Sequence, residues 1–320
     1  MRTVPTSTIN RRIRSATYVS VAFALAAAFL TLGPVEAGAS SQHARAQSRG
    51  VTCPPGSVGV SGSGASPINA PPFGGVGMAG TNSCDGYWIA NAVGVVTVVG
   101  SAPALGSLDG MHLNAPVVGI ASDPKGRGYW LVASDGGVFA FGASGYFGSI
   151  AGISLNSPVV GMASSPDGNG YWLVSADGGV FAFGSAKFQG SLGGQRLNAP
   201  IVGISADPYG GYWLVGSDGG VFAMGSSPFL GSMGGKPLNS GIAGIDSSLS
   251  GHGYVLVGTD GGVFAFGDAP YLGSMAGTPL SAPVNSIVVT PSGRGYWEAA
   301  DDGGIFAFGD APFFGNAIGV

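Results

Sequence analysis

A dipeptide that returns at a nearly constant interval constrains the fold of this chain more than any other feature. Gly-Tyr recurs with its tyrosine at Tyr87, Tyr129, Tyr171, Tyr212, Tyr254 and Tyr296, so the intervals are 42, 42, 41, 42 and 42 residues. A repeat of this length is typical of architectures in which each copy is one supersecondary unit. We therefore divide the sequence into six units, at 68–112, 113–154, 155–196, 197–237, 238–279 and 280–320.

The unit at 113–154 contains turn signals that divide it into four short strands. An Asp-Pro-Lys-Gly turn at 123–126 follows the first apolar segment, and Asp135-Gly136 between two further apolar segments is a strong hairpin signal. The expected strands are Val117–Ala121, Tyr129–Ser134, Val138–Phe141 and Tyr146–Ser149. Each unit is thus predicted to be a four-stranded antiparallel meander.

These sheets are apolar on both faces. In the second strand, Tyr129 and Leu131 point to one face while Trp130 and Val132 point to the other. Both faces must be covered, and neighbouring copies are the material available to cover them. The sequence therefore predicts an all-β fold, a β-propeller of six four-stranded blades closed into a ring. A seven-bladed ring and a stacked β-solenoid are the alternatives.

The first 46 residues are typical of a secretory signal peptide. Basic residues near the start (Arg11, Arg12 and Arg14) precede an apolar run at 21–32, and small residues allow cleavage after Ala37 or Ala46. The run is shorter than the roughly 20 residues that a spanning helix needs, so we favour cleavage over an uncleaved membrane anchor. We expect a secreted, extracellular protein that can associate with the cell envelope. After cleavage, no segment is expected to insert into a membrane.

Removal of residues 1–46 leaves seven Lys and Arg against fifteen Asp and Glu, a net charge of −8. Nucleic acid is not an expected partner, because binding to phosphates requires clustered cations. The two cysteines, Cys53 and Cys84, are expected to form a disulfide in the oxidising environment outside the cell. It would tether the Gly, Ser and Pro-rich lead-in at 47–67 to the loop between the first two strands of the first unit.

The repeats also resemble known propeller blades. Residues 116–142, PVVGIASDPKGRGYWLVASDGGVFAFG, resemble NHL-type blades in the Gly-Ile-Ala, Asp-Pro and Gly-Tyr positions and quinoprotein-type blades in DGGVFAFG. More closely, the GYWLV and DGGVFAFG segments resemble the Gly-rich repeats of secreted actinobacterial proteins, which occur alone or beside cell-wall-directed domains. The resemblance covers 68–320 and implies blade architecture, but no particular activity.

Two sets of recurring side chains are candidates for binding. An aromatic surface for sugar rings is one interpretation of the repeated tryptophans, although their position in the middle of a strand favours burial between blades. The repeated turn aspartates could form an acidic ring, although turn chemistry explains them first. The tryptophans are Trp88, Trp130, Trp172, Trp213 and Trp297, with Val255 at the sixth position; the aspartates are Asp135, Asp177, Asp218, Asp260 and Asp302.

The last unit departs most from the repeat. Glu298 takes a position that Leu or Ile fills elsewhere, and Asp301 and Asp302 follow closely. A lone buried carboxylate is costly. We expect a looser, wetter interface between the last unit and the first, with a ligand or cation site built from these three acids as the alternative.

Other chemistry-bearing residues do not form a recognisable site. His112 and His252 fall in loops that a propeller places on opposite faces, so a shared metal site or catalytic dyad is not expected. The segment at 75–80, GVGMAG, matches G-x-G-x-x-G, but a strand follows it instead of the helix that would bind a phosphate. No cofactor, metal site or catalytic residue is predicted.

Three functions remain as hypotheses at this stage. The first is a secreted, non-enzymatic interaction or scaffold module at the cell envelope, with an envelope protein or polysaccharide as its partner. The second is a carbohydrate-binding, lectin-like propeller. The third is a hydrolase or a quinoprotein-like enzyme, for which Glu298 and Asp302 are the available acids.

Overall fold

The computed structural model describes Cys53 and residues 75–317. The predicted signal peptide, the rest of the lead-in and residues 68–74 lie outside the described residues. The chain divides into two compact units, Met1–Gln47 and Ser48–Val320, and the described residues belong to the second. Its regular elements are all β-strands within the part of the chain that the structure describes.

Eighteen strands form six three-stranded antiparallel sheets, one from each sequence unit, numbered here as sheets 1 to 6 in chain order. Sheet 1 contains β1 (Gly75–Gly80), β2 (Gly86–Asn91) and β3 (Val96–Gly100); sheet 2 β4 (Val117–Ser122), β5 (Gly128–Ala133) and β6 (Val138–Gly142); sheet 3 β7 (Val159–Ser164), β8 (Gly170–Ser175) and β9 (Val180–Gly184); sheet 4 β10 (Ile201–Ala206), β11 (Tyr212–Gly216) and β12 (Val221–Met224); sheet 5 β13 (Ile242–Ser247), β14 (Gly253–Gly258) and β15 (Val263–Gly267); sheet 6 β16 (Val284–Val289), β17 (Gly295–Ala300) and β18 (Ile305–Gly309).

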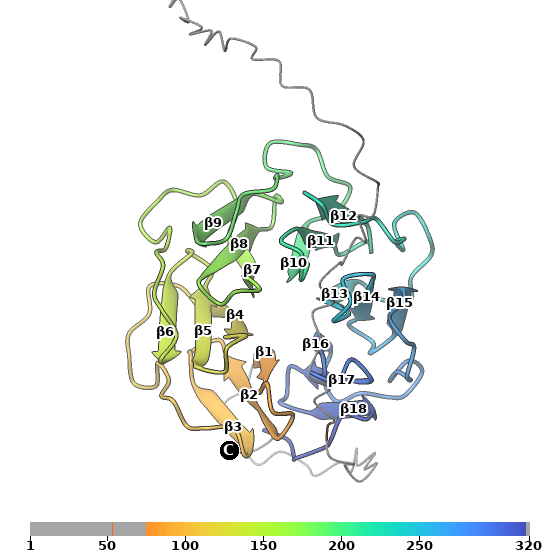
Figure 1. Ribbon diagram of the computed structural model, residues 1–320. Coiled ribbons are helices and arrows are strands. Elements are labelled where there is room, and N and C mark those ends of the chain that lie inside the picture. The colour runs from red at the N-terminus through yellow and green to blue at the C-terminus, as the bar shows by residue number, and fades with distance from the viewer. Residues whose placement is uncertain (1–52, 54–74, 318–320) are drawn as a thin grey trace, which may run out of the picture. The chain divides into compact units, whose positions relative to one another are not determined.

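The sheets follow one another around a ring. The first strand of each sheet lies at the centre, and β1, β4, β7, β10, β13 and β16 contact one another in that order, with β16 returning to β1 (Figure 1). The second strand lies in the middle of each sheet and the third lies outermost. In every sheet, the pairing of the first strand with the second shifts register after the first residue of the first strand, as between Val117 and Gly119. This arrangement is consistent with a β-propeller.

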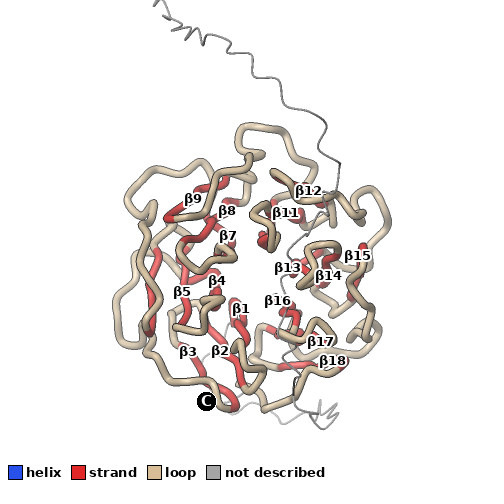
Figure 2. The backbone as a smooth tube through the Cα atoms, in the orientation of Figure 1, coloured by secondary structure: helices blue, strands red, loops and turns tan. Residues whose placement is uncertain are grey.

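The predicted fourth strand is wrong. Residues 146–149 are irregular backbone in the loop that leads from sheet 2 to sheet 3 (Figure 2). The Phe147 amide donates to the Tyr171 hydroxyl at 3.1 Å, and that hydroxyl donates to the Gly148 carbonyl at 2.6 Å. Because a tyrosine of the next sheet takes these two backbone groups, they do not pair with β6.

The same tyrosine contact recurs between sheets that are distant in sequence. The Tyr87 hydroxyl of sheet 1 donates to the carbonyl of Gly315, which follows sheet 6, at 2.6 Å. The Tyr87 ring lies 5.7 Å from the ring of Trp297. The first and last sheets are therefore in contact, which does not fit the alternative of a stacked solenoid.

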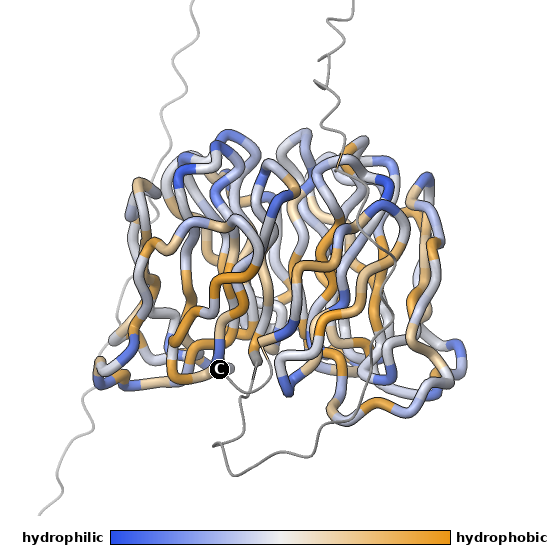
Figure 3. Tube along the Cα trace, turned by 90° about the horizontal axis from the view of Figure 1, so that it is seen from below, coloured by the Kyte–Doolittle hydropathy of each residue, from blue (hydrophilic) through white to orange (hydrophobic). Residues whose placement is uncertain are grey.

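Six hydrophobic clusters fill the spaces between neighbouring sheets. Between sheets 2 and 3, for example, Trp130 and Val132 of β5 meet Tyr171 and Leu173 of β8. Hydrophobic residues lie mainly along the strands, and hydrophilic residues are frequent in the loops at the upper end of the view in Figure 3. The cluster between sheets 6 and 1 contains Tyr87, Ile89 and Trp297, each at most 1% exposed. The expectation of a loose, wet interface there is therefore wrong.

Candidate functional site

The recurring tryptophans are core residues. All five are at most 3% exposed. Each indole nitrogen donates to a backbone carbonyl fifteen residues later, as from Trp130 to Gly145 at 2.7 Å and from Trp172 to Lys187 at 2.8 Å. Burial between sheets, the favoured interpretation, agrees with this geometry. The alternative, a tryptophan surface for sugar rings, is wrong because those rings are inaccessible.

A different aromatic position is exposed. Sixteen residues after the tryptophan position, on the segments that connect sheets 2 to 3, 3 to 4, 4 to 5 and 5 to 6, the chain places Tyr146, Phe188, Phe229 and Tyr271. Their exposed fractions are 60%, 60%, 62% and 61%. We call these four residues the perimeter aromatics. Tyr146 was expected in the fourth strand and the other three were not predicted, although their constant offset from the tryptophan position is visible in the sequence.

The backbone around three of the four perimeter aromatics is held on two sides. At Phe188, the preceding Lys187 carbonyl accepts from Trp172, and the following Gln189 amide donates to Tyr212 at 3.2 Å. Phe229 is held in the same way, by Trp213 and Tyr254. At Tyr271, Val255 takes the tryptophan position and has no indole to donate, so the contact of the Leu272 amide with Tyr296 remains. These exposed rings therefore project from fixed backbone positions.

The predicted disulfide is present. Cys53 and Cys84 are bonded, with 5.3 Å between their Cα atoms. Cys84 lies in the loop between β1 and β2, as expected, and is the one non-glycine residue with a positive φ, 58°, among the described residues. Both cysteines are buried in the cluster between sheets 6 and 1. The disulfide fits an oxidising environment outside the cell.

The repeated aspartates close turns. Oδ1 of Asp135 accepts from the Gly137 amide at 2.9 Å, and Asp177, Asp218, Asp260 and Asp302 make the same bond two residues on, at 3.0 to 3.1 Å. An aspartate that binds its own backbone two residues later stabilises a tight turn. Their carboxylates therefore serve the turns between the second and third strands.

Glu298 lies at a different interface from the one expected. It is fully buried in β17, between Ile287 of β16 and Phe306 of β18, and it faces sheet 5: Oε2 approaches Gly261, at 3.0 Å from the point where a Cβ would stand. Neither carboxylate oxygen has a hydrogen-bond partner. Burial, together with the charge of Asp260, raises the pKa of Glu298 to about 8.

The three acids singled out in the last unit do not converge. Asp301 accepts from the Asn285 amide at 2.8 Å, Asp302 closes its turn and Glu298 is inaccessible. Over the residues described, no group of three or more His, Cys, Asp or Glu side chains could hold a metal ion. His112 and His252 are exposed in separate loops. The 75–80 segment is strand β1, and β2 follows it.

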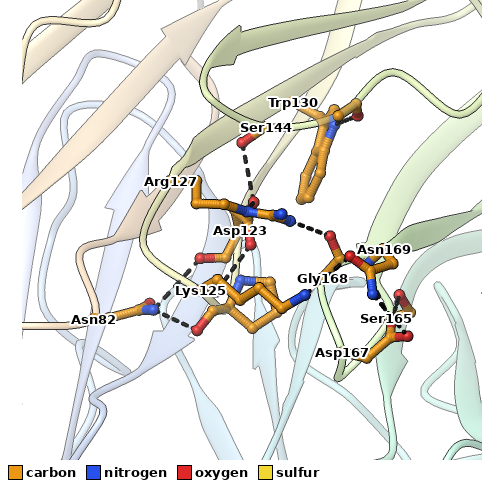
Figure 4. A network of polar contacts seen from close by, with 12 residues as sticks. Asn82, Asp123, Lys125, Arg127, Trp130, Ser144, Ser165, Asp167, Gly168 and Asn169 are labelled. Carbon is orange, nitrogen blue, oxygen red and sulfur yellow. Dashed lines mark hydrogen bonds and ion pairs between the residues drawn. The ribbon is translucent and has the colours of Figure 1, made fainter.

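Several of the basic side chains are engaged in contacts between loops (Figure 4). Arg127 pairs with the buried Asp123 at 2.6 Å and donates to the Gly168 carbonyl of sheet 3. Lys125 donates to Asn169 at 2.9 Å, and Asn82 of sheet 1 donates to the Pro124 carbonyl at 2.6 Å. These contacts join the loops of sheets 1, 2 and 3.

A central cavity of about 540 Å³ is lined by the inner strands of all six sheets. Its wall is mainly Gly, Ala, Val, Ile and Met, and Asp246 of β13 is the one ionisable side chain among the lining residues. Asp246 pairs across the sheet with Val255, whereas tryptophan occupies that cross-strand position in the other five sheets. Sequence analysis noted Val255 but missed Asp246; a comparison of paired strands would have found both.

No helix in the described part of the chain has the length and apolarity needed to cross a membrane. A scan against protein-family models finds no match to this sequence, and neither does a search of curated proteins.

Proposed function

We propose that this protein is a secreted six-bladed β-propeller, with three-stranded blades, that acts as a non-enzymatic interaction module at the cell envelope. The ring of sheets supports the propeller assignment, and the disulfide supports an extracellular setting. The signal-like segment at 1–46 and the resemblance to repeats of secreted proteins support export.

The observation that carries the binding function is the set of perimeter aromatics. Four aromatic rings, each about 60% exposed, stand at one position on successive blades. Aromatic side chains have few rotatable bonds, so they supply contact area at a low cost in conformational entropy. Equivalent weak contacts on one rigid body bind a repetitive or multivalent partner more tightly than any one contact does alone.

A retention experiment tests this function. Mature protein is incubated with purified envelope polysaccharide, peptidoglycan and surface-protein fractions, and saturable retention is measured. We expect retention by at least one fraction, and a roughly ten-fold or larger loss when all four residues are replaced, as Tyr146→Ser, Phe188→Ser, Phe229→Ser and Tyr271→Ser. Unchanged retention in this variant, or no saturable retention by any fraction, would overturn the proposal.

The matched control replaces exposed apolar residues outside this position. Val93, Met111 and Ile153 are 64%, 59% and 61% exposed. Their replacement by Ser changes the surface by a comparable amount but leaves the perimeter aromatics intact. We expect this control to bind as the wild type does. Loss of retention in both variants would indicate nonspecific apolar adsorption.

The same aromatic rings also favour carbohydrate as a second candidate partner, because sugar rings stack on aromatic faces. The fractions in the retention experiment separate the two candidates. Retention on polysaccharide or peptidoglycan alone identifies a lectin-like function, and retention by protein fractions alone identifies a protein-binding module.

A further inference from the structure

The central cavity has the size and lining of a small-molecule site. Sites of this kind usually enclose about 300 to 1,000 Å³, with mainly apolar walls and a few polar groups that fix orientation. The cavity of about 540 Å³ is lined by the inner strands of the six sheets, and these strands surround the middle of the ring in Figure 2. Its apolar wall comes from residues such as Met78, Ile120, Met162 and Ile204.

The polar side chains of the wall are most frequent on sheets 5 and 6, while sheets 2, 3 and 4 each add one serine, Ser122, Ser164 and Ser205. Those on sheets 5 and 6 include Asp246, Ser247 and Ser286. The Ser286 hydroxyl oxygen is buried and has no hydrogen-bond partner. Asp246 remains partly accessible, because it borders the cavity. A ligand in the cavity would therefore meet one ionisable side chain, on sheet 5, in a wall that is otherwise mainly apolar.

The Asp246 carboxylate is fixed in position but lacks a counter-ion. Oδ1 accepts from the Ser247 amide at 2.9 Å and from the Ser205 hydroxyl at 3.3 Å, and Oδ2 accepts from the Val289 amide at 2.8 Å. A carboxylate can accept about four hydrogen bonds, so capacity for a further donor remains. Within the described residues, the one ion pair is that of Arg127 with Asp123.

Burial raises the pKa of Asp246 to about 6, which leaves the group mostly ionised at pH 7 but poorly stabilised. A cation that enters the cavity would supply the missing stabilisation. The mainly apolar wall strengthens such a pair, since the effective dielectric constant near it is lower than in bulk water.

The fold does not require this carboxylate. The equivalent residue is Ala79 in sheet 1, Ala121 in sheet 2 and Ala163 in sheet 3, and each pairs with a tryptophan. In sheet 5 both members of the pair change, to Asp246 and Val255. Departures from a repeat that carry a local energetic cost are expected at functional positions.

We propose that the central cavity binds a small organic cation, an ammonium group on an apolar body, with Asp246 as its counter-ion. The apolar body contacts the walls of sheets 1 to 3, and the ammonium group donates to the free position on the carboxylate. This site is separate from the perimeter aromatics and does not depend on their function.

Titration with two probes of similar shape tests the proposal. Binding of n-hexylammonium chloride and of 1-hexanol to the mature, disulfide-bonded protein is measured by calorimetry and by NMR. We expect one saturable n-hexylammonium site per chain, with an affinity at least about ten-fold higher than that for 1-hexanol, because the carboxylate attracts only the charged probe. Equal affinities for the two probes, or no saturable binding, would overturn the proposal.

Two variants assign the effect to Asp246. Asp246→Asn keeps the shape and removes the charge, so the preference for the charged probe should disappear. Asp109→Asn removes an exposed carboxylate outside the cavity, so the preference should remain. A preference for n-hexylammonium that survives in Asp246→Asn contradicts the assignment.

A second design guards against a variant that fails to fold. Asp246→Ala combined with Val255→Trp restores the alanine–tryptophan pair of sheets 1 to 3, and we expect it to fold with native circular dichroism. It should bind the two probes with equal affinity. A folded double variant that still prefers n-hexylammonium would also overturn the proposal.

Discussion

The interface between sheets 2 and 3 and the interface between sheets 5 and 6 are built from equivalent positions but differ in chemistry. Between sheets 2 and 3, the Trp130 ring lies 5.7 Å from the Tyr171 ring, and Leu173 is fully buried beside them. Between sheets 5 and 6, Val255 takes the tryptophan position and Glu298 takes the leucine position. One interface is apolar throughout, whereas the other contains a buried carboxylate and a smaller side chain.

One pair of tyrosine hydrogen bonds that joins the sheets is the same at both interfaces. Tyr296 donates to the Gly273 carbonyl at 2.5 Å and accepts from the Leu272 amide at 3.0 Å, as Tyr171 does with Gly148 and Phe147. The position of one sheet against the next is thus maintained although the apolar contacts differ. The tyrosine bonds therefore tolerate changes in the core, and the interface between sheets 5 and 6 accommodates a buried carboxyl group.

The largest effect is expected from Glu298→Leu. The pKa of Glu298 is raised from an ordinary value of 4.5 to about 8, so folding retains a proton that the unfolded chain releases. The contribution of Glu298 to wild-type stability should therefore be greatest below about pH 4.5 and fall as the pH rises to about 8. At pH 9 the leucine variant should be more stable by roughly 3–5 kcal/mol, measured by urea unfolding.

The shape of the pH profile separates the two buried acids. The pKa of Asp246 is raised to about 6, so its contribution is lost at lower pH than that of Glu298. In Glu298→Leu, the decline between pH 6 and pH 8 should disappear while the decline below pH 6 remains. The reciprocal variant, Leu173→Glu, places a carboxyl group between sheets 2 and 3. Its stability should then decline more steeply between pH 6 and pH 8 than that of the wild type. A wild-type profile that is flat from pH 6 to pH 9 would contradict the assignment.

The second largest effect is expected from Trp130→Val, which gives the interface between sheets 2 and 3 the side chain found in sheet 5. It removes the ring contact with Tyr171 and the indole bond to the Gly145 carbonyl. We expect a loss of roughly 2–4 kcal/mol, since truncation of a buried aromatic leaves a cavity. Trp130→Phe, which keeps a ring, should cost less. A loss below about 1 kcal/mol would show that the two interfaces are energetically alike.

The repeat period and the turn signals predicted most strand positions, because apolar alternation and turn residues are local patterns in the sequence. The first three strands of the second unit were expected at 117–121, 129–134 and 138–141, close to β4, β5 and β6. The fourth was wrong, because Phe147 and Gly148 bind a tyrosine of the next unit, a contact that local alternation does not contain.

The candidate sites were less predictable for a related reason. Periodicity shows that Glu298 and Leu173 share a position, but not which neighbouring sheet that position faces. The structure supplies that direction, toward sheet 5. The Asp246 and Val255 pair becomes visible only when the register of two strands is known, since the residues are neither adjacent nor part of a motif.

The smallest of these effects is expected from removal of one tyrosine hydroxyl, and it tests what the two interfaces share. Tyr171→Phe leaves the Phe147 amide and the Gly148 carbonyl without their partner, which should cost roughly 1–2 kcal/mol. Tyr296→Phe should cost the same at the interface between sheets 5 and 6, because its bonds have matching lengths. Urea unfolding measures both, and hydrogen exchange should show faster exchange of the Phe147 and Leu272 amides in the respective variants. A larger loss of stability in Tyr296→Phe would show that the interface with Val255 and Glu298 depends more heavily on its tyrosine. The Tyr296 bonds would then compensate for weaker core packing between sheets 5 and 6, and the two tyrosines would not have the same role.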